Sequence, residues 1–147
     1  EDTTRTPLMI VAPKATPGLP GGTTKGTICA TPVSLMDVYP TLLELCGLEA
    51  RQGLSGKSLV PLLKDPQADW DRPALTTQGR QNHALRTQRW RYIRYADGSE
   101  ELYDHTQDPH EWHNIADKPE HAEVKAQLAR WLPTSDAPNA AVRQRRK

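Results

Sequence analysis

The stretch G-R-Q-N-H-A-L-R-T-Q-R-W-R-Y-I-R-Y-A-D-G-S-E-E-L-Y-D, from Gly79 to Asp104, decides the fold of this chain. It predicts three short strands, and the residues just upstream predict a fourth: about 83–87, 90–95, 100–103 and, upstream, 74–77. Asp97-Gly98 separates the last two of these strands. Such a pair is typical of a type I′ hairpin turn, in which both central residues adopt positive φ. We therefore expect a small antiparallel sheet.

The segment after this sheet predicts one packed helix, over about residues 119–132. Pro119 suits a first helical turn, and Pro133 cannot continue the helix. An apolar stripe recurs at roughly helical spacing in Val124, Leu128, Trp131 and Leu132. Because side chains alternate along a strand, Trp90 and Tyr92 share the face that this helix would cover.

A turn-rich loop, residues 106–116, is expected between the last strand and the helix. Asp108-Pro109 predicts a turn, and we expect Trp112 and Ile115 to pin the loop to the sheet. Three histidines lie in or beside the loop: His105, His110 and His113. They permit a metal-binding hypothesis. The preferred interpretation of this loop is the turn pinned to the sheet.

The first half of the chain begins with a continuous apolar run, T-P-L-M-I-V-A-P, from Thr6 to Pro13. Such a run suits a strand that is buried on both faces. No second run of this kind follows, and a single strand cannot satisfy its backbone groups. We therefore expect the sheet to which this strand belongs to lie mostly outside these residues.

Helical patterns follow this run. Thr31 is a plausible N-cap with Pro32 at the first helical position, and Pro40 predicts a bend between two short helices. Gly47 is expected to end the helical stretch, and Cys46 to be buried on its apolar face. Residues 53–63 predict a turn and then a short apolar helix.

These patterns divide the chain into four segments. We expect an α/β segment over residues 1–65, a connector over 66–73, an α+β unit with the antiparallel sheet and its helix over 74–133, and a flexible basic tail over 134–147.

Composition excludes several classes of protein. A net charge of +1, with both signs spread widely over 147 residues, argues against a nucleic-acid-binding protein. The mean hydropathy is −0.72, and no apolar run approaches the ~20 residues that a membrane span needs. A disulfide between Cys29 and Cys46 stays open, because two cysteines do not define a framework.

Four pieces of the chain, in this order and at this spacing, resemble the C-terminal third of type I sulfatases. The pieces are V-S-L-M-D-V-Y-P-T-L-L-E-L-C-G-L (33–48), G-K-S-L-V-P-L-L (56–63), H-A-L-R-T-Q-R-W-R-Y-I-R-Y (83–95) and E-L-Y-D-H-T-Q-D-P-H-E-W-H-N-I-A (101–116). They are most similar to the iduronate-2-sulfatase-like group of bacteria. The run at residues 6–13 looks like the strand that follows the last catalytic segment of this family.

The resemblance implies the C-terminal part of an alkaline-phosphatase-like α/β fold, in which the last strand and helices of the large domain precede a small antiparallel subdomain with one helix. It implies hydrolysis of sulfate esters, export of the full enzyme, and a substrate class of sulfated carbohydrates. The family uses calcium and a formylglycine made from C/S-x-P-x-R. Neither Cys29 nor Cys46 has proline two residues on and arginine four residues on, so we expect this segment to lack the nucleophile and metal ligands. Its expected partner is the N-terminal remainder of the enzyme.

Substrate-contacting residues are expected in the loop that leads into the strand at residue 83, namely Arg80, Asn82 and His83. A guanidinium or imidazole at the rim of a pocket suits an anionic sulfated sugar. The alternatives are a solvated loop charge for Arg80 and a packed, locally hydrogen-bonded histidine for His83. For the chain as a whole, the alternative to an enzyme part is a stand-alone, non-catalytic binding or scaffold module.

Overall fold

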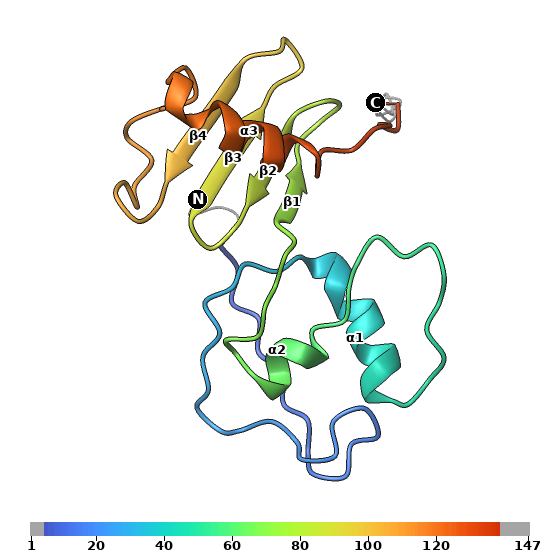
Figure 1. Cartoon of the computed structure of the whole chain (residues 1–147). Coiled ribbons are helices and arrows are strands. Elements are labelled where there is room, and N and C mark those ends of the chain that lie inside the picture. The colour runs from blue at the N-terminus through green and yellow to red at the C-terminus, as the bar shows by residue number, and fades with distance from the viewer. Residues whose placement is uncertain (1–4, 139–147) are drawn as a thin grey trace, which may run out of the picture. The chain divides into compact units, whose positions relative to one another are not determined.

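The computed structural model describes residues 5–138. The chain divides into two compact units, Glu1–Ala74 and Leu75–Lys147 (Figure 1). Among the helices of this described range, none has the length and apolar character needed to cross a membrane.

The sheet of the second unit has four strands in the order β1-β2-β3-β4 (Figure 1). The strands are β1 (Ala74–Thr77), β2 (His83–Arg86), β3 (Trp90–Arg94) and β4 (Glu100–Asp104). The pairs β2–β3 and β3–β4 are antiparallel, and their register places Leu85 and Leu102 on either side of Tyr92. The predicted antiparallel sheet is therefore confirmed, with strand ends that differ from the prediction by at most one residue.

The hairpin between β3 and β4 differs from the predicted type I′ turn. The Gly98 N–H donates to the Tyr95 carbonyl at 3.0 Å, and the Tyr95 N–H donates to the Ser99 carbonyl at 3.0 Å. Gly98 has a φ of +86°, whereas Asp97 does not have a positive φ. The connection is a three-residue loop that ends in a left-handed glycine. The Asp97 carboxylate accepts from the Ser99 N–H and hydroxyl, which stabilises this wider loop.

Helix α3 (Ala122–Ala129) covers one face of this sheet, after a 3-10 turn, η2 (Pro119–His121) (Figure 1). The core between them consists of Leu85, Tyr92, Leu102, Ala116 and Leu128, with Trp90, Val124 and Leu132 packed against it. The predicted helix and its shared sheet face are confirmed. Trp131 follows the end of the helix at Ala129 and is exposed, so its assignment to the buried stripe was wrong.

The loop after β4 is pinned by one of the two predicted residues. Ile115 packs against the core, and its N–H donates to the Leu102 carbonyl at 3.0 Å. Trp112 is 77% exposed and stacks on His110, with 5.2 Å between ring centroids. Glu111, between them, has a φ of +59° and is only partly exposed, and its carboxylate accepts from His105 and Arg91. This backbone turn separates the inward Glu111 from its outward neighbours, which the sequence pattern did not predict.

In the first unit, a 3-10 turn, η1 (Leu35–Asp37), continues directly into α1 (Val38–Leu45), and α2 (Val60–Lys64) follows later. The N-cap is Ser34, in a capping box with Asp37, so the predicted start at Thr31-Pro32 was wrong. Pro40 lies in the first turn of α1, where a missing N–H leaves no helical hydrogen bond unmade. The predicted bend at Pro40 is therefore not required.

The end of α1 confirms the predicted glycine cap. Gly47 has a φ of +68°, its N–H donates to the Glu44 carbonyl, and the Leu48 N–H donates to the Leu43 carbonyl. This is the Schellman arrangement. Cys46 is exposed rather than buried, because it occupies the cap position after the helix. Both cysteines are free thiols in this structure.

The apolar run at residues 6–13 forms no strand in the part of the chain that the structure describes. Its expected assignment as a buried strand is therefore not met within these residues. Ala12 exchanges hydrogen bonds with Thr23 and packs beside Leu45 and Val60. Met9 is 89% exposed and Val11 is 87% exposed. A strand needs a neighbour for its backbone N–H and C=O groups, and this segment finds no ladder partner among residues 5–138.

Candidate functional site

The three predicted site residues lie in and just after the β1–β2 loop. The Gln78 N–H donates to the Asn82 carbonyl at 3.0 Å and closes this loop. Gly79 and Gln81 have φ values of +71° and +63°. A left-handed conformation is strained for a residue with a side chain, so the position of Gln81 requires support from its surroundings.

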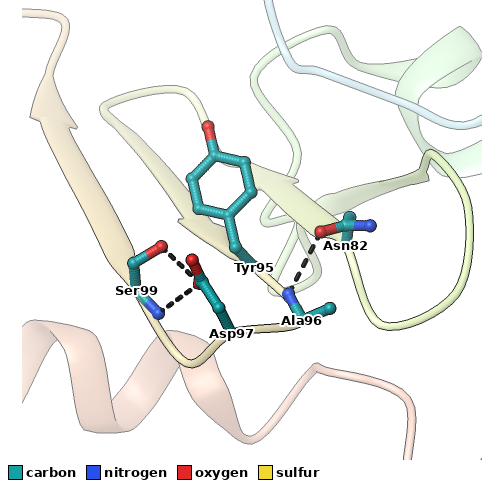
Figure 2. A pocket seen from close by; sticks show the side chains of 5 residues that line it. All are labelled: Asn82, Tyr95, Ala96, Asp97 and Ser99. Atoms are coloured by element: carbon teal, nitrogen blue, oxygen red, sulfur yellow. Dashed lines mark hydrogen bonds between the residues drawn. The ribbon is translucent and has the colours of Figure 1, made fainter.

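Asn82 fastens the loop to the neighbouring β3–β4 hairpin. Its Oδ1 accepts from the Ala96 N–H at 3.1 Å, and its Nδ2 donates to the Arg80 carbonyl at 3.2 Å. Figure 2 shows Asn82 facing Ala96 across the gap between the two loops. An open hollow of about 430 Å³ lies here, lined by Asn82, Tyr95, Ala96, Asp97 and Ser99.

The groups around this hollow are polar and set in defined positions. Burial and a 3.0 Å hydrogen bond to Glu101 raise the pKa of Tyr95, so its phenol keeps its proton. The hydroxyl and N–H of Ser99 lower the pKa of the exposed Asp97 carboxyl. A carboxylate beside an aromatic ring and an amide can form hydrogen bonds with hydroxyl-rich ligands.

His83 lies at the start of β2 and is 6% exposed. Its Nδ1 is 2.9 Å from the Thr77 hydroxyl, and its Nε2 is 3.2 Å from Oδ2 of Asp136. Both ring nitrogens therefore have partners inside the second unit. This geometry favours the packed, locally bonded alternative for the His83 ring.

Arg80 is exposed in the same loop, and its carbonyl is held by Asn82. The structure thus places Arg80 and Asn82 beside each other on the surface and buries the His83 ring behind them. Two contributors were not predicted: the hairpin residues of the hollow, and Asp136, which is 53 residues away from His83 in the sequence. Asp136 lies in the segment expected to be a flexible tail. Residues 139–147 of that tail lie outside the described residues.

Calcium does not fit the residues seen here. Throughout residues 5–138, no group of three or more His, Cys, Asp or Glu side chains is arranged to hold a metal ion. The histidines of the loop after β4 have other contacts: His105 meets Arg86 and Glu111, His110 stacks on Trp112, and His113 lies near Asp108. The metal-binding hypothesis for these histidines gains no support.

Comparison with solved structures identifies similar folds. The protein BT4656, solved in complex with its substrate D-glucosamine-2-N,6-O-disulfate, is 28% identical, with a TM-score of 0.53, over 64% of this chain and 22% of that chain. Ps i-CgsB, solved with k-i-k-neocarrahexaose, is 25% identical, with a TM-score of 0.50, over 68% of this chain and 22% of that one. The fold is therefore shared with about a fifth of each of these larger proteins.

Comparison with curated protein sequences identifies sulfatases as relatives. A sulfatase of Formosa agariphila is 43% identical over 116 residues, which cover 79% of this chain and 21% of the relative. Arylsulfatase K of Danio rerio is 34% identical over 128 residues, which cover 79% of this chain and 23% of the relative. The chain thus spans about a fifth of the length of these relatives. Residues 1–137 match the family described as N-sulphoglucosamine sulphohydrolase, C-terminal, and the chain belongs to this family of sulfatase C-terminal domains.

Proposed function

We propose that this chain is the C-terminal segment of a sulfatase that hydrolyses sulfate esters of sulfated carbohydrates, and that this sulfatase is of the iduronate-2-sulfatase-like group. The observation that carries the proposal is the family match over residues 1–137, combined with coverage of only about a fifth of the relatives. The substrate class is supported by the disulfated glucosamine that BT4656 binds.

In this proposal, residues 1–65 complete the large α/β domain, 66–73 connect it to the small subdomain of residues 74–133, and the reacting groups lie in the preceding part of the polypeptide. Calcium and formylglycine would there supply charge neutralisation on the sulfate and the attacking oxygen. Neither Cys29 nor Cys46 has the sequence context for conversion to formylglycine. The present residues would provide core structure and one side of the substrate pocket.

The pocket rim is proposed to include Arg80, Asn82 and His83. The exposed Arg80 guanidinium suits a sulfate or carboxylate group of the sugar, because its planar donors match an oxyanion. Asn82 joins the loop to the hairpin hollow, and the buried His83 supports the loop from below rather than presenting its ring. This role for His83 fits its 6% exposure.

Kinetics of a polypeptide that contains both this chain and the preceding part test the proposal. Arg80→Ala should raise KM for a sulfated disaccharide about tenfold, because one charge-assisted contact is lost, while hydrolysis of the small ester nitrophenyl sulfate changes little. Residues 1–147 alone should not hydrolyse nitrophenyl sulfate. Turnover by these residues alone, or unchanged kinetics in both Arg80→Ala and His83→Ala, would contradict the proposal. If the chain is instead a non-catalytic module, both the longer polypeptide and residues 1–147 alone should bind the sugar without hydrolysing it.

A further inference from the structure

The β1–β2 loop is held from two sides. On one side, Asn82 joins it to the hairpin through the Ala96 N–H. On the other side, a single oxygen of Asp136, Oδ2, accepts from the Gln81 N–H at 3.1 Å and lies 3.2 Å from His83 Nε2. Arg80 directly precedes the residues that make these two attachments. The second attachment comes from the segment after α3, far away in the chain.

The protons of this contact can be assigned from the chemistry of the groups. A carboxylate only accepts, so the Nε2 of His83 must carry the proton that it shares with Asp136. In the neutral ring, Nδ1 then accepts from the hydroxyl of Thr77, 2.9 Å away. The series Thr77–His83–Asp136 therefore links β1, β2 and the C-terminal segment of the same unit.

The backbone of the loop needs this support. Gln81 is in the left-handed region with a φ of +63°, and its N–H points to Asp136. Such a conformation persists where surrounding contacts impose it. Without Asp136, the Gln81 N–H loses its acceptor, and the buried His83 ring keeps a polar nitrogen without its partner. The loop would then relax, and Arg80 would lose its fixed position.

We propose that Asp136 is a positioning residue of the substrate rim, which acts through Gln81 and His83 to hold Arg80 and Asn82 in place. This inference rests on the proposed function and adds to it a residue outside the family-like motifs of the sequence. Asp136 does not touch the substrate in this proposal. Its effect is on the population of the loop conformation that presents Arg80.

Hydrogen exchange and kinetics on the polypeptide that includes the preceding part test the proposal. Asp136→Ala should speed amide exchange in the peptide that contains Gln81 about tenfold and raise KM for a sulfated disaccharide about threefold to tenfold, with kcat within twofold. Asp136→Asn keeps an acceptor oxygen, so its amide exchange and its KM should both return most of the way to the wild-type values. The matched control is Asp117→Ala, an exposed acidic residue of the same unit, which should change neither.

The outcomes separate this inference from the proposed function. If Arg80→Ala raises KM but Asp136→Ala changes neither exchange nor KM, the positioning role is wrong and the rim proposal stands. If Asp136→Ala speeds exchange without raising KM, Asp136 is only structural and the inference is overturned. If both Arg80→Ala and His83→Ala leave the kinetics unchanged, the rim proposal itself fails. Equal loss in Asp136→Ala and Asp136→Asn would also contradict the role, since the conservative variant should rescue it.

Discussion

The two units of this molecule use apolar residues in opposite ways. The second unit encloses its large apolar side chains between the sheet and α3, where Leu85, Tyr92 and Leu102 have almost no exposed surface. The first unit has a smaller cluster around Leu45 and Val60. It leaves many large apolar side chains exposed, namely Met9, Val11, Ile28, Leu35, Met36, Leu42 and Leu48.

The first unit relies instead on buried polar contacts. The Asp37 carboxylate accepts from the backbone N–H groups of Ser34 and Lys57, both at 2.8 Å. The Thr41 hydroxyl donates to the Asp37 carbonyl and accepts from the Leu59 N–H at 2.8 Å. These bonds join η1, α1 and the segment before α2. The described residues of the second unit thus enclose a core of their own, whereas the first unit presents an apolar surface of the kind that contacts further protein.

The largest expected effect comes from separating the units. Residues 74–138 alone should unfold in one cooperative transition, because the core of the sheet and α3 lies wholly within them. Residues 1–73 alone should associate or lack a transition, because their exposed apolar surface has no cover. Circular dichroism melts and size-exclusion chromatography measure both. A monomeric, cooperatively melting first unit would remove the distinction between the two.

Within the second unit, burial should separate two large apolar residues. Leu102→Ala should destabilise residues 74–138 by about 2–5 kcal/mol, because Leu102 is fully buried in the core. Trp112→Ala should change stability by less than about 0.5 kcal/mol, since that ring is exposed and contacts His110. Urea unfolding gives both values. A large loss in Trp112→Ala would restore the sequence-based expectation that Trp112 pins its loop.

In the first unit, the corresponding sensitive position is polar. Thr41→Val keeps the shape of the side chain but removes the acceptor for the Leu59 N–H, and should cost about 1–3 kcal/mol of local stability. Hydrogen exchange of the peptide that contains Leu59, measured in the longer polypeptide, reports this loss. Thr27→Val, at an exposed threonine, is the control and should leave exchange unchanged. Equal exchange in both variants would show that the Thr41 contact carries no stability.

The contrast between the units also explains which features the sequence could predict. In the second unit, alternation along β2–β4 and the spacing of Val124 and Leu128 point to contacts made within the unit, so strands and helix were predicted closely. In the first unit, the apolar pattern does not coincide with the buried face: Asp37 and Thr41 are buried, while Met36 and Leu42 are exposed. A hydrophobic pattern identifies surfaces that need cover, but it does not say whether this chain supplies that cover.

The candidate site could be predicted only where its residues are close in sequence. The loop with Arg80 and Asn82 follows from its place before β2, and the hairpin from Asp97-Gly98. The wider three-residue turn depends on the Asp97 side chain, and the Asp136 contact joins positions 53 residues apart. No local pattern marks a contact of that span. The segment around Asp136 has the polar, proline-containing composition of a tail.

Acid should weaken the second unit through Asp104. The Arg89 guanidinium, with help from Thr106, lowers the pKa of this buried carboxyl from its usual 3.8 to about 2. A lowered folded-state pKa contributes stability that is present above about pH 4 and is lost as the pH falls through 2. Between pH 5 and pH 2.5, Tm of residues 74–138 should fall about 5 °C more in the wild type than in Asp104→Asn. Part of the fall should persist in the variant, because Lys125 and Tyr92 also lower the pKa of Glu100.

The smallest effect is expected at the ion pair of the first unit. Lys57 Nζ lies 3.4 Å from the Asp71 carboxylate, and both side chains are exposed, whereas the Arg89–Asp104 pair has one buried partner and a 2.7 Å contact. Water and salt screen an exposed pair, and ordering two flexible side chains offsets much of its attraction. Asp71→Asn should therefore change stability by less than about 0.5 kcal/mol, and 0.5 M salt should remove the difference. Denaturation of the longer polypeptide at low and high salt measures this. A larger, salt-resistant loss would mean that the surface around Lys57 is shielded from water. The contrast between an exposed first unit and a second unit with an enclosed core would then not apply to the region around Lys57.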